Sequence, residues 1–70
     1  MKRLFYGPEV IITFKTGTKL RVFTTLIDFE SFINEFKDDG YSFSIRDCET
    51  DELHFVSKQH VLYIEVIREM

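Results

Sequence analysis

The residues of this chain that could perform nucleophilic chemistry are one cysteine, Cys48, and two histidines, His54 and His60. A cysteine acts as a nucleophile when a nearby base or cation stabilises its thiolate. Asp47 and Glu49 flank Cys48, and neighbouring negative charges disfavour the thiolate instead. The sequence also lacks a glycine-rich phosphate loop, a nucleophile elbow and a paired-cysteine motif. We therefore predict that the protein is not an enzyme and requires no cofactor.

The acidic segment around Cys48 is a second candidate for chemistry. Asp47, Glu49 and Asp51 alternate as the first ligands of a calcium-binding loop do. Such a loop needs glycine at its sixth position and glutamate at its twelfth, where this chain has Glu52 and Lys58. The segment is therefore predicted to be a solvated acidic turn, and no metal site is expected.

Basic and aromatic side chains alternate in the first third of the chain. Lys19, Arg21 and Phe23 occupy every second position, so they share one face if the segment is a strand. A face of this kind could follow a phosphate backbone and stack a base. The net charge of the chain is −3, whereas dedicated nucleic-acid-binding proteins are usually basic. A solvated strand face is the alternative interpretation.

These basic residues are positioned by a predicted β-hairpin over residues 9–25. A three-residue loop of Lys15, Thr16 and Gly17 places Gly17 at the left-handed position of the turn. The face that should enter the core then carries Val10, Ile12, Phe14, Leu20 and Val22. The opposite face carries Ile11, Thr13, Lys19, Arg21 and Phe23. A two-residue loop would mix apolar and basic side chains on each face, which favours the three-residue loop.

A single helix is predicted over residues 28–40. Its apolar stripe recurs at helical spacing and consists of Phe29, Phe32, Ile33 and Phe36. Asp28 is the predicted N-cap, and Gly40 is the predicted left-handed residue that ends the helix. Three aromatic rings on one stripe need a broad apolar surface, so we expect the helix to pack on a sheet.

Three further strands complete the predicted fold, over residues 41–46, 53–57 and 60–68. The last is apolar on both faces, which predicts a central strand that is covered on both sides. Leu4, Phe5 and Tyr6 are expected to pack on the domain or to form a short edge strand. The chain is thus predicted to form one α+β domain over residues 1–70, with element order β-β-α-β-β-β. Its antiparallel sheet should carry the one helix packed on one face.

Composition limits the compartment in which the protein works. A chain of 70 residues can bury only a small core, and eight Phe and three Tyr supply much of its apolar area. One cysteine fits a reducing compartment. The longest apolar run, residues 61–64, is too short to span a bilayer. A cytoplasmic protein without a membrane partner is therefore expected.

The hairpin around Phe14–Thr18, the helix from Asp28 to Phe36 and the closing strand Val61–Val66 have a familiar layout. Together they resemble small α+β proteins encoded by bacterial mobile elements and phages, most of which have no known role. The resemblance covers most of the chain but contains no diagnostic motif. It implies a non-enzymatic protein that acts by binding, as a regulator or inhibitor.

We predict a protein-binding module that docks on a partner protein or forms a homodimer. One helix can cover only one side of a small sheet, and exposed apolar patches often mark contact sites. The residues predicted to make this contact are Ile11, Phe23 and Tyr63, with Lys19 and Arg21 at the rim. One alternative is nucleic-acid binding through the basic hairpin face. The other is an acidic inhibitor that imitates nucleic acid with Glu30, Glu35, Asp47, Glu49 and Asp51.

Overall fold

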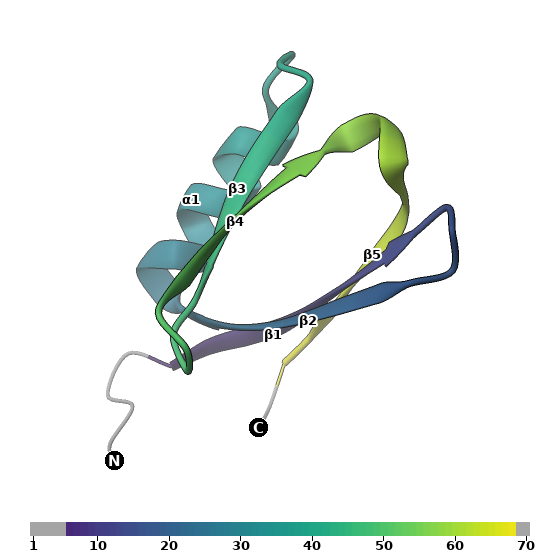
Figure 1. Cartoon of the computed structure of the whole chain (residues 1–70). Coiled ribbons are helices and arrows are strands. Elements are labelled where there is room, and N and C mark those ends of the chain that lie inside the picture. Colours follow the sequence, from purple (N-terminus) through teal and green to yellow (C-terminus); the bar gives the residue numbers. More distant parts are fainter. Residues whose placement is uncertain (1–5, 69–70) are drawn as a thin grey trace.

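The computed structural model describes residues 6–68, and within them it contains five strands and one α-helix (Figure 1). The elements follow in the order β1 (Tyr6–Phe14), β2 (Lys19–Thr25), α1 (Leu26–Lys37), β3 (Ser42–Asp47), β4 (Glu52–Ser57) and β5 (Val61–Ile67). A 3₁₀ turn, η1 (Lys58–His60), lies between β4 and β5. All paired strands are antiparallel, so the predicted α+β class and element order are confirmed.

The strands are divided between two sheets, a division that the sequence pattern did not indicate. One sheet has three strands in the order β2-β1-β5, and the other consists of β3 and β4. Figure 1 shows β3 and β4 crossing the three-stranded sheet, with α1 beside β3. The helix packs mainly on β3 and also contacts β1 and β2. It therefore joins the two sheets along one side of the molecule.

The β1–β2 hairpin has the predicted register. Val10 pairs with Val22, and at the end of the ladder the Phe14 N–H donates to the Thr18 carbonyl at 2.8 Å. Gly17 has a left-handed φ of 97°, as the three-residue loop requires. The division of the hairpin into a core face and an opposite face is thereby confirmed.

The loop conformation gives a first testable prediction. Gly17→Val should lower the free energy of unfolding by about 1–2 kcal/mol, because a β-branched residue is strained at left-handed φ. No atom lies within 4 Å of the position that a Cβ would take at Gly17, so this cost comes from the backbone alone. Thr16→Asn in the same loop should be tolerated, and urea denaturation of both variants makes the comparison. Equal midpoints for the two variants would contradict the strain.

The helix begins earlier than predicted. Its N-cap is Thr25 and not Asp28, because the Thr25 hydroxyl oxygen accepts the backbone N–H of Asp28 at 3.0 Å. The last residue of β2 thus caps the helix directly, without an intervening loop. Asp28 lies in the first turn, where a carboxylate interacts favourably with the helix dipole.

The predicted helix end at Gly40 is also wrong. The helix ends at Lys37, and Gly40 does not have the left-handed φ that a stop signal requires. The chain leaves the helix through Asp38, whose backbone is extended and whose carbonyl accepts a hydrogen bond from Lys58 Nζ at 2.5 Å. The chain therefore leaves the helical conformation before it reaches Gly40 and continues to β3. No helix in the described residues is long and apolar enough to cross a membrane.

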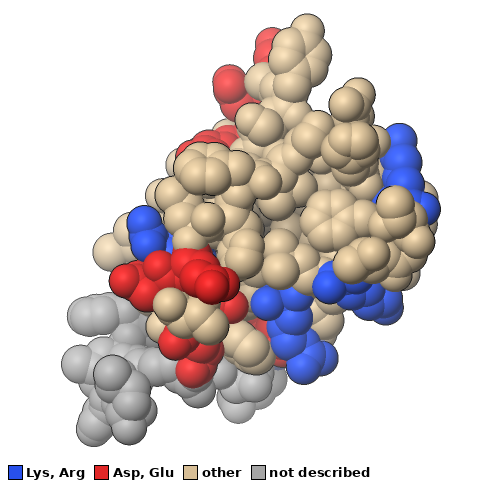
Figure 2. Space-filling view, in the orientation of Figure 1, with Lys and Arg blue, Asp and Glu red and all other residues tan. Residues whose placement is uncertain are grey.

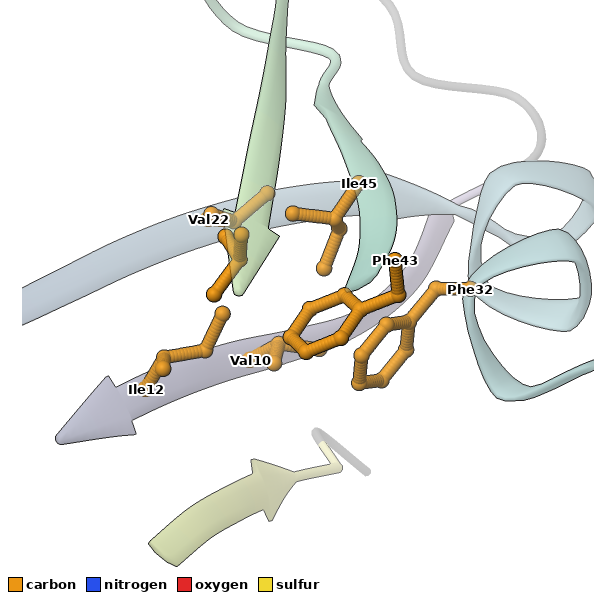
Figure 3. Close-up of a cluster of buried hydrophobic side chains, with 7 residues drawn as sticks. Val10, Ile12, Val22, Phe32, Phe43 and Ile45 are labelled. Carbon is orange, nitrogen blue, oxygen red and sulfur yellow. The ribbon is translucent and has the colours of Figure 1, made fainter. Parts of the chain in front are cut away.

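The core lies between the two sheets and against the helix, as Figure 3 shows. Its buried apolar residues are Val10, Ile12, Val22, Phe32, Phe43, Ile45 and Val56. The ring of Phe32 meets that of Phe43 edge-on, with 5.3 Å between centroids. The predicted helix stripe therefore faces the core at Phe32, with Phe29 and Ile33 partly buried beside it. Phe36, at the far end of the stripe, remains 40% exposed.

β5 is an edge strand and not the central strand that its sequence predicted. Within residues 6–68 it pairs only with β1, which is the central strand of its sheet. A register shift in this pairing places Val61 on the core side, together with Ile64. Tyr63 and Ile67 point away from the core and are 48% and 41% exposed. Apolar residues on both faces of β5 therefore do not reflect cover on both sides.

The expectation for the N-terminal segment falls mostly outside the described residues. Leu4 and Phe5 are not described, and Tyr6 is the first residue of β1. Packing of this segment across the domain stays a prediction.

Candidate functional site

The five residues predicted to make a contact lie together on the face of the three-stranded sheet that points away from the core. Pairing across β2, β1 and β5 builds this face in three rows. The rows are Phe23, Glu9 and Ile67, then Arg21, Ile11 and Glu65, and then Lys19, Thr13 and Tyr63. We call these residues the outer face. The structure thus brings all five predicted residues together, from strands that are far apart in the sequence.

The outer face is buried or half-buried along its central strand β1 and exposed along β5. Ile11 and Phe23 are half-buried between their neighbours. Tyr63 and Ile67 are 48% and 41% exposed, and the adjacent Leu62 is 57% exposed. Tyr63 and Ile67 lie on either side of Glu65 along the edge strand, and exposed apolar side chains of this kind often mark contact with another surface.

The charges of the outer face are of both signs. Arg21 Nε lies 2.5 Å from Glu9 Oε2, and the Glu9 side chain is only 15% exposed. Glu65 pairs with Ile11 on the side opposite Arg21. Two carboxylates therefore lie among the basic residues that the sequence suggested for phosphate binding. Because a carboxylate repels phosphate, this arrangement fits a mixed protein surface better than a polyanion.

The residues with nucleophilic potential lie in three different segments. Cys48 lies in the turn between β3 and β4, and its N–H donates to the Phe23 carbonyl at 2.6 Å. His60 lies in η1, at the opposite end of β4. His54 Nε2 is 3.7 Å from Glu52 Oε1. The described residues contain no group of three or more histidine, cysteine or acidic side chains that could hold a metal ion.

Several of the acidic residues proposed as a nucleic-acid mimic make contacts with other residues of the domain. Asp47 is buried, and its Oδ1 accepts the backbone N–H of Glu49 at 2.7 Å, which shapes the turn. Glu35 accepts both the backbone N–H and the hydroxyl of Ser44, at 2.7 and 3.0 Å. Asp51 lies 3.3 Å from an Arg46 nitrogen. These contacts give Asp47 and Glu35 structural roles that the sequence alone did not reveal.

A second surface feature was missed by the sequence reasoning. A groove of about 700 Å³ lies between the tip of the β1–β2 hairpin and the free edge of β4. Its lining residues are Phe14, Lys15, Thr16, Leu20, Leu53, His54, Phe55, Val56, Ser57 and His60. We call it the β4 groove. The sequence does contain an indication of this groove. Leu53 and Phe55 point to one face of β4 and Val56 to the other, so the strand has apolar side chains on both faces.

Comparisons of this chain with protein-family models, with curated proteins and with solved structures found no match. The outer face and the β4 groove are two candidate contact surfaces among the described residues.

Proposed function

We propose that the protein is a non-enzymatic protein-binding module that docks through its outer face, on a partner protein or on a second copy of itself. The observation that carries the proposal is the patch along β5. Tyr63 and Ile67 are exposed there and lie in the same rows as Lys19 and Phe23. By occupying a surface of its partner, such a module would act as a regulator or inhibitor.

The composition of the outer face supports a protein as the partner. Interfaces between proteins have an apolar centre and a polar rim, and aromatic and arginine side chains contribute most of their binding energy. Tyr63 and Phe23 supply the aromatic side chains. Arg21 and Lys19 lie on β2, at the edge of the outer face. The guanidinium of Arg21 is already oriented by Glu9, which reduces the entropy lost when it contacts a partner.

Replacement of Tyr63 tests the proposal. Tyr63→Asp should weaken docking by about 30-fold, the effect expected when an aromatic anchor worth about 2 kcal/mol is lost. The fold should be retained, because Tyr63 is about half exposed and lies outside the core. Sedimentation equilibrium measures self-association, and affinity purification from the producing cells with quantitative mass spectrometry measures partner capture. Thermal melting of the variant checks that it folds.

Tyr41 provides a matched control, because it carries the same side chain at a 90% exposed position before β3. Tyr41→Asp should leave self-association and partner capture unchanged. The proposal fails if Tyr63→Asp retains both, or if the two variants lose them equally.

Nucleic-acid binding is the second candidate, since Lys19 and Arg21 are both exposed on β2. In that case the Lys19→Glu and Arg21→Glu double variant should abolish binding of a fluorescent oligonucleotide. The affinity of the unmodified protein should also fall with salt, with a log–log slope of about −0.7 per phosphate contact on a single strand. If the protein does not bind the oligonucleotide, or binds it with an affinity that does not change with salt, nucleic-acid binding is contradicted and protein docking stays as the proposal.

A further inference from the structure

We propose that the β4 groove binds an extended acidic segment of another protein, which adds to β4 as a further strand. The groove borders β4 in the two-stranded sheet, whereas the outer face belongs to the three-stranded sheet. The inference therefore goes beyond the function proposed above and does not depend on it.

The first observation is that β4 has a free hydrogen-bonding edge. The Ser44 N–H donates to Glu35, so it points away from β4, and the pair of Ser44 with Phe55 is one without mutual hydrogen bonds. The N–H and C=O of Phe55 therefore point away from β3, as do those of Leu53 and Ser57 two positions on either side. In the described part of the chain β4 pairs only with β3. An extended segment could bond to these groups without displacing any strand.

The second observation is that the β4 edge carries none of the usual protection against pairing. Natural edge strands are guarded by lysine, proline or bulges. The free edge of β2 carries Lys19 and Arg21, and its Phe23 carbonyl already accepts the Cys48 N–H at 2.6 Å. From Leu53 to Ser57, β4 has no lysine, proline or arginine, and its register with β3 has no bulge. The edge is regular and open to a further strand.

The third observation is the apolar character of the groove beside this edge. Phe14, Leu20 and Val56 line it from the core side, while Phe55 is 78% exposed at its margin. Figure 2 shows mostly uncharged side chains between β4 and the hairpin on this side of the molecule. Five residues of strand, 53–57, extend over roughly 13–17 Å, so a segment of four or five residues would fit along them. Its alternate side chains would enter the groove.

The fourth observation is the charge of the groove, which selects the partner. Its ionisable lining residues are Lys15, His54 and His60, and no carboxylate lines it. The Lys15 N–H donates to the His60 carbonyl at 2.9 Å, which holds these two residues together at one end. Glu52 Oε1 lies 3.7 Å from His54 Nε2 at the other side of the groove. On the side drawn in Figure 2, acidic side chains lie near the β3–β4 turn and at the upper end of the molecule. A segment with acidic residues beside Lys15 is therefore favoured.

A display library of random ten-residue peptides supplies the probe. Peptides enriched on the full chain should alternate apolar residues and carry an excess of Asp and Glu. One enriched peptide is then labelled, and its affinity is measured by fluorescence anisotropy. Phe55→Pro should weaken binding roughly tenfold more than Phe55→Ala, because proline removes the outward N–H while both variants lose the ring. The β3–β4 ladder does not use that N–H, so both variants should keep the fold, which circular dichroism checks.

Charge and location are tested with further variants. Lys15→Glu should weaken the peptide about fivefold, whereas the control Lys37→Glu on the exposed end of α1 should stay within about twofold. Tyr63→Asp on the outer face should also leave peptide affinity unchanged. The proposal for the β4 groove and the proposal for the outer face are therefore tested independently.

The proposal is overturned by any of four results. These are no enriched peptide, enrichment without excess acid, equal effects of Phe55→Pro and Phe55→Ala, or a concentration-dependent dimer that Phe55→Pro abolishes. The last result would identify a second copy of the chain as the occupant.

Discussion

Phe32→Ala is expected to cost about 3–5 kcal/mol of the free energy of unfolding, the loss typical of a buried phenylalanine truncated to alanine. The Phe32 side chain is 1% exposed. Its ring lies 6.0 Å from those of Phe29 and Phe36 and 5.3 Å from that of Phe43. The substitution therefore opens a cavity where the helix meets the two-stranded sheet. A domain of 70 residues has a total free energy of unfolding of only about 4–10 kcal/mol. The variant should therefore be either largely unfolded or folded with little stability left.

Urea denaturation followed by circular dichroism at 25 °C measures this loss. Glu30→Ala on the exposed side of α1 is the control and should stay within about 0.5 kcal/mol of the unmodified protein. Phe36→Ala should cost less than Phe32→Ala, because Phe36 is already 40% exposed. A Phe32→Ala variant that melts within a few degrees of the unmodified protein would show that the helix does not hold the core as described.

The second large effect is expected at Gly7, where β1 passes the junction of β2 and α1. A Cβ at this position would lie 2.7 Å from the Thr25 carbonyl oxygen and 3.0 Å from the Leu26 nitrogen. Both are backbone atoms and cannot rotate away. Gly7→Ala should therefore cost about 1–3 kcal/mol, as overpacking does elsewhere. The damage should be local to the helix N-terminus, since Thr25 is also the N-cap.

Hydrogen exchange of the first-turn amides, together with urea denaturation, measures this effect. Gly40→Ala is the matched control, because the nearest atom to its new Cβ would be a side-chain oxygen of Asp38 at 3.6 Å. Gly40 has no left-handed φ, so alanine there should be neutral or slightly stabilising. Equal losses for the two glycines would mean that the close approach at Gly7 relaxes without cost.

Local patterns in the sequence were sufficient for the hairpin and for the helix stripe. The side-chain period of a strand is two, so only one loop length keeps Val10 and Val22 on an apolar face, and the structure has that register. The stripe around Phe32 follows from helical periodicity in the same way, and Phe32 is buried. The element order and the α+β class were predictable because each element carries its own period. The placement of Ile11 and Phe23 on one face also followed from alternation, whereas the side on which Tyr63 lies depends on the pairing of β5 with β1.

Only the tertiary structure decided which surfaces remain exposed and where the helix ends. A pattern of apolar residues shows that a face can be buried, but it does not show what covers it. β5 is apolar on both faces, yet the strand order places it at an edge. The helix ends at Lys37, where Asp38 takes an extended backbone conformation, and the Asp38 carbonyl accepts a hydrogen bond from Lys58, 20 residues further along the chain. The β4 groove arises because the strands divide into two sheets, and the local period of a strand does not specify which other strand it pairs with.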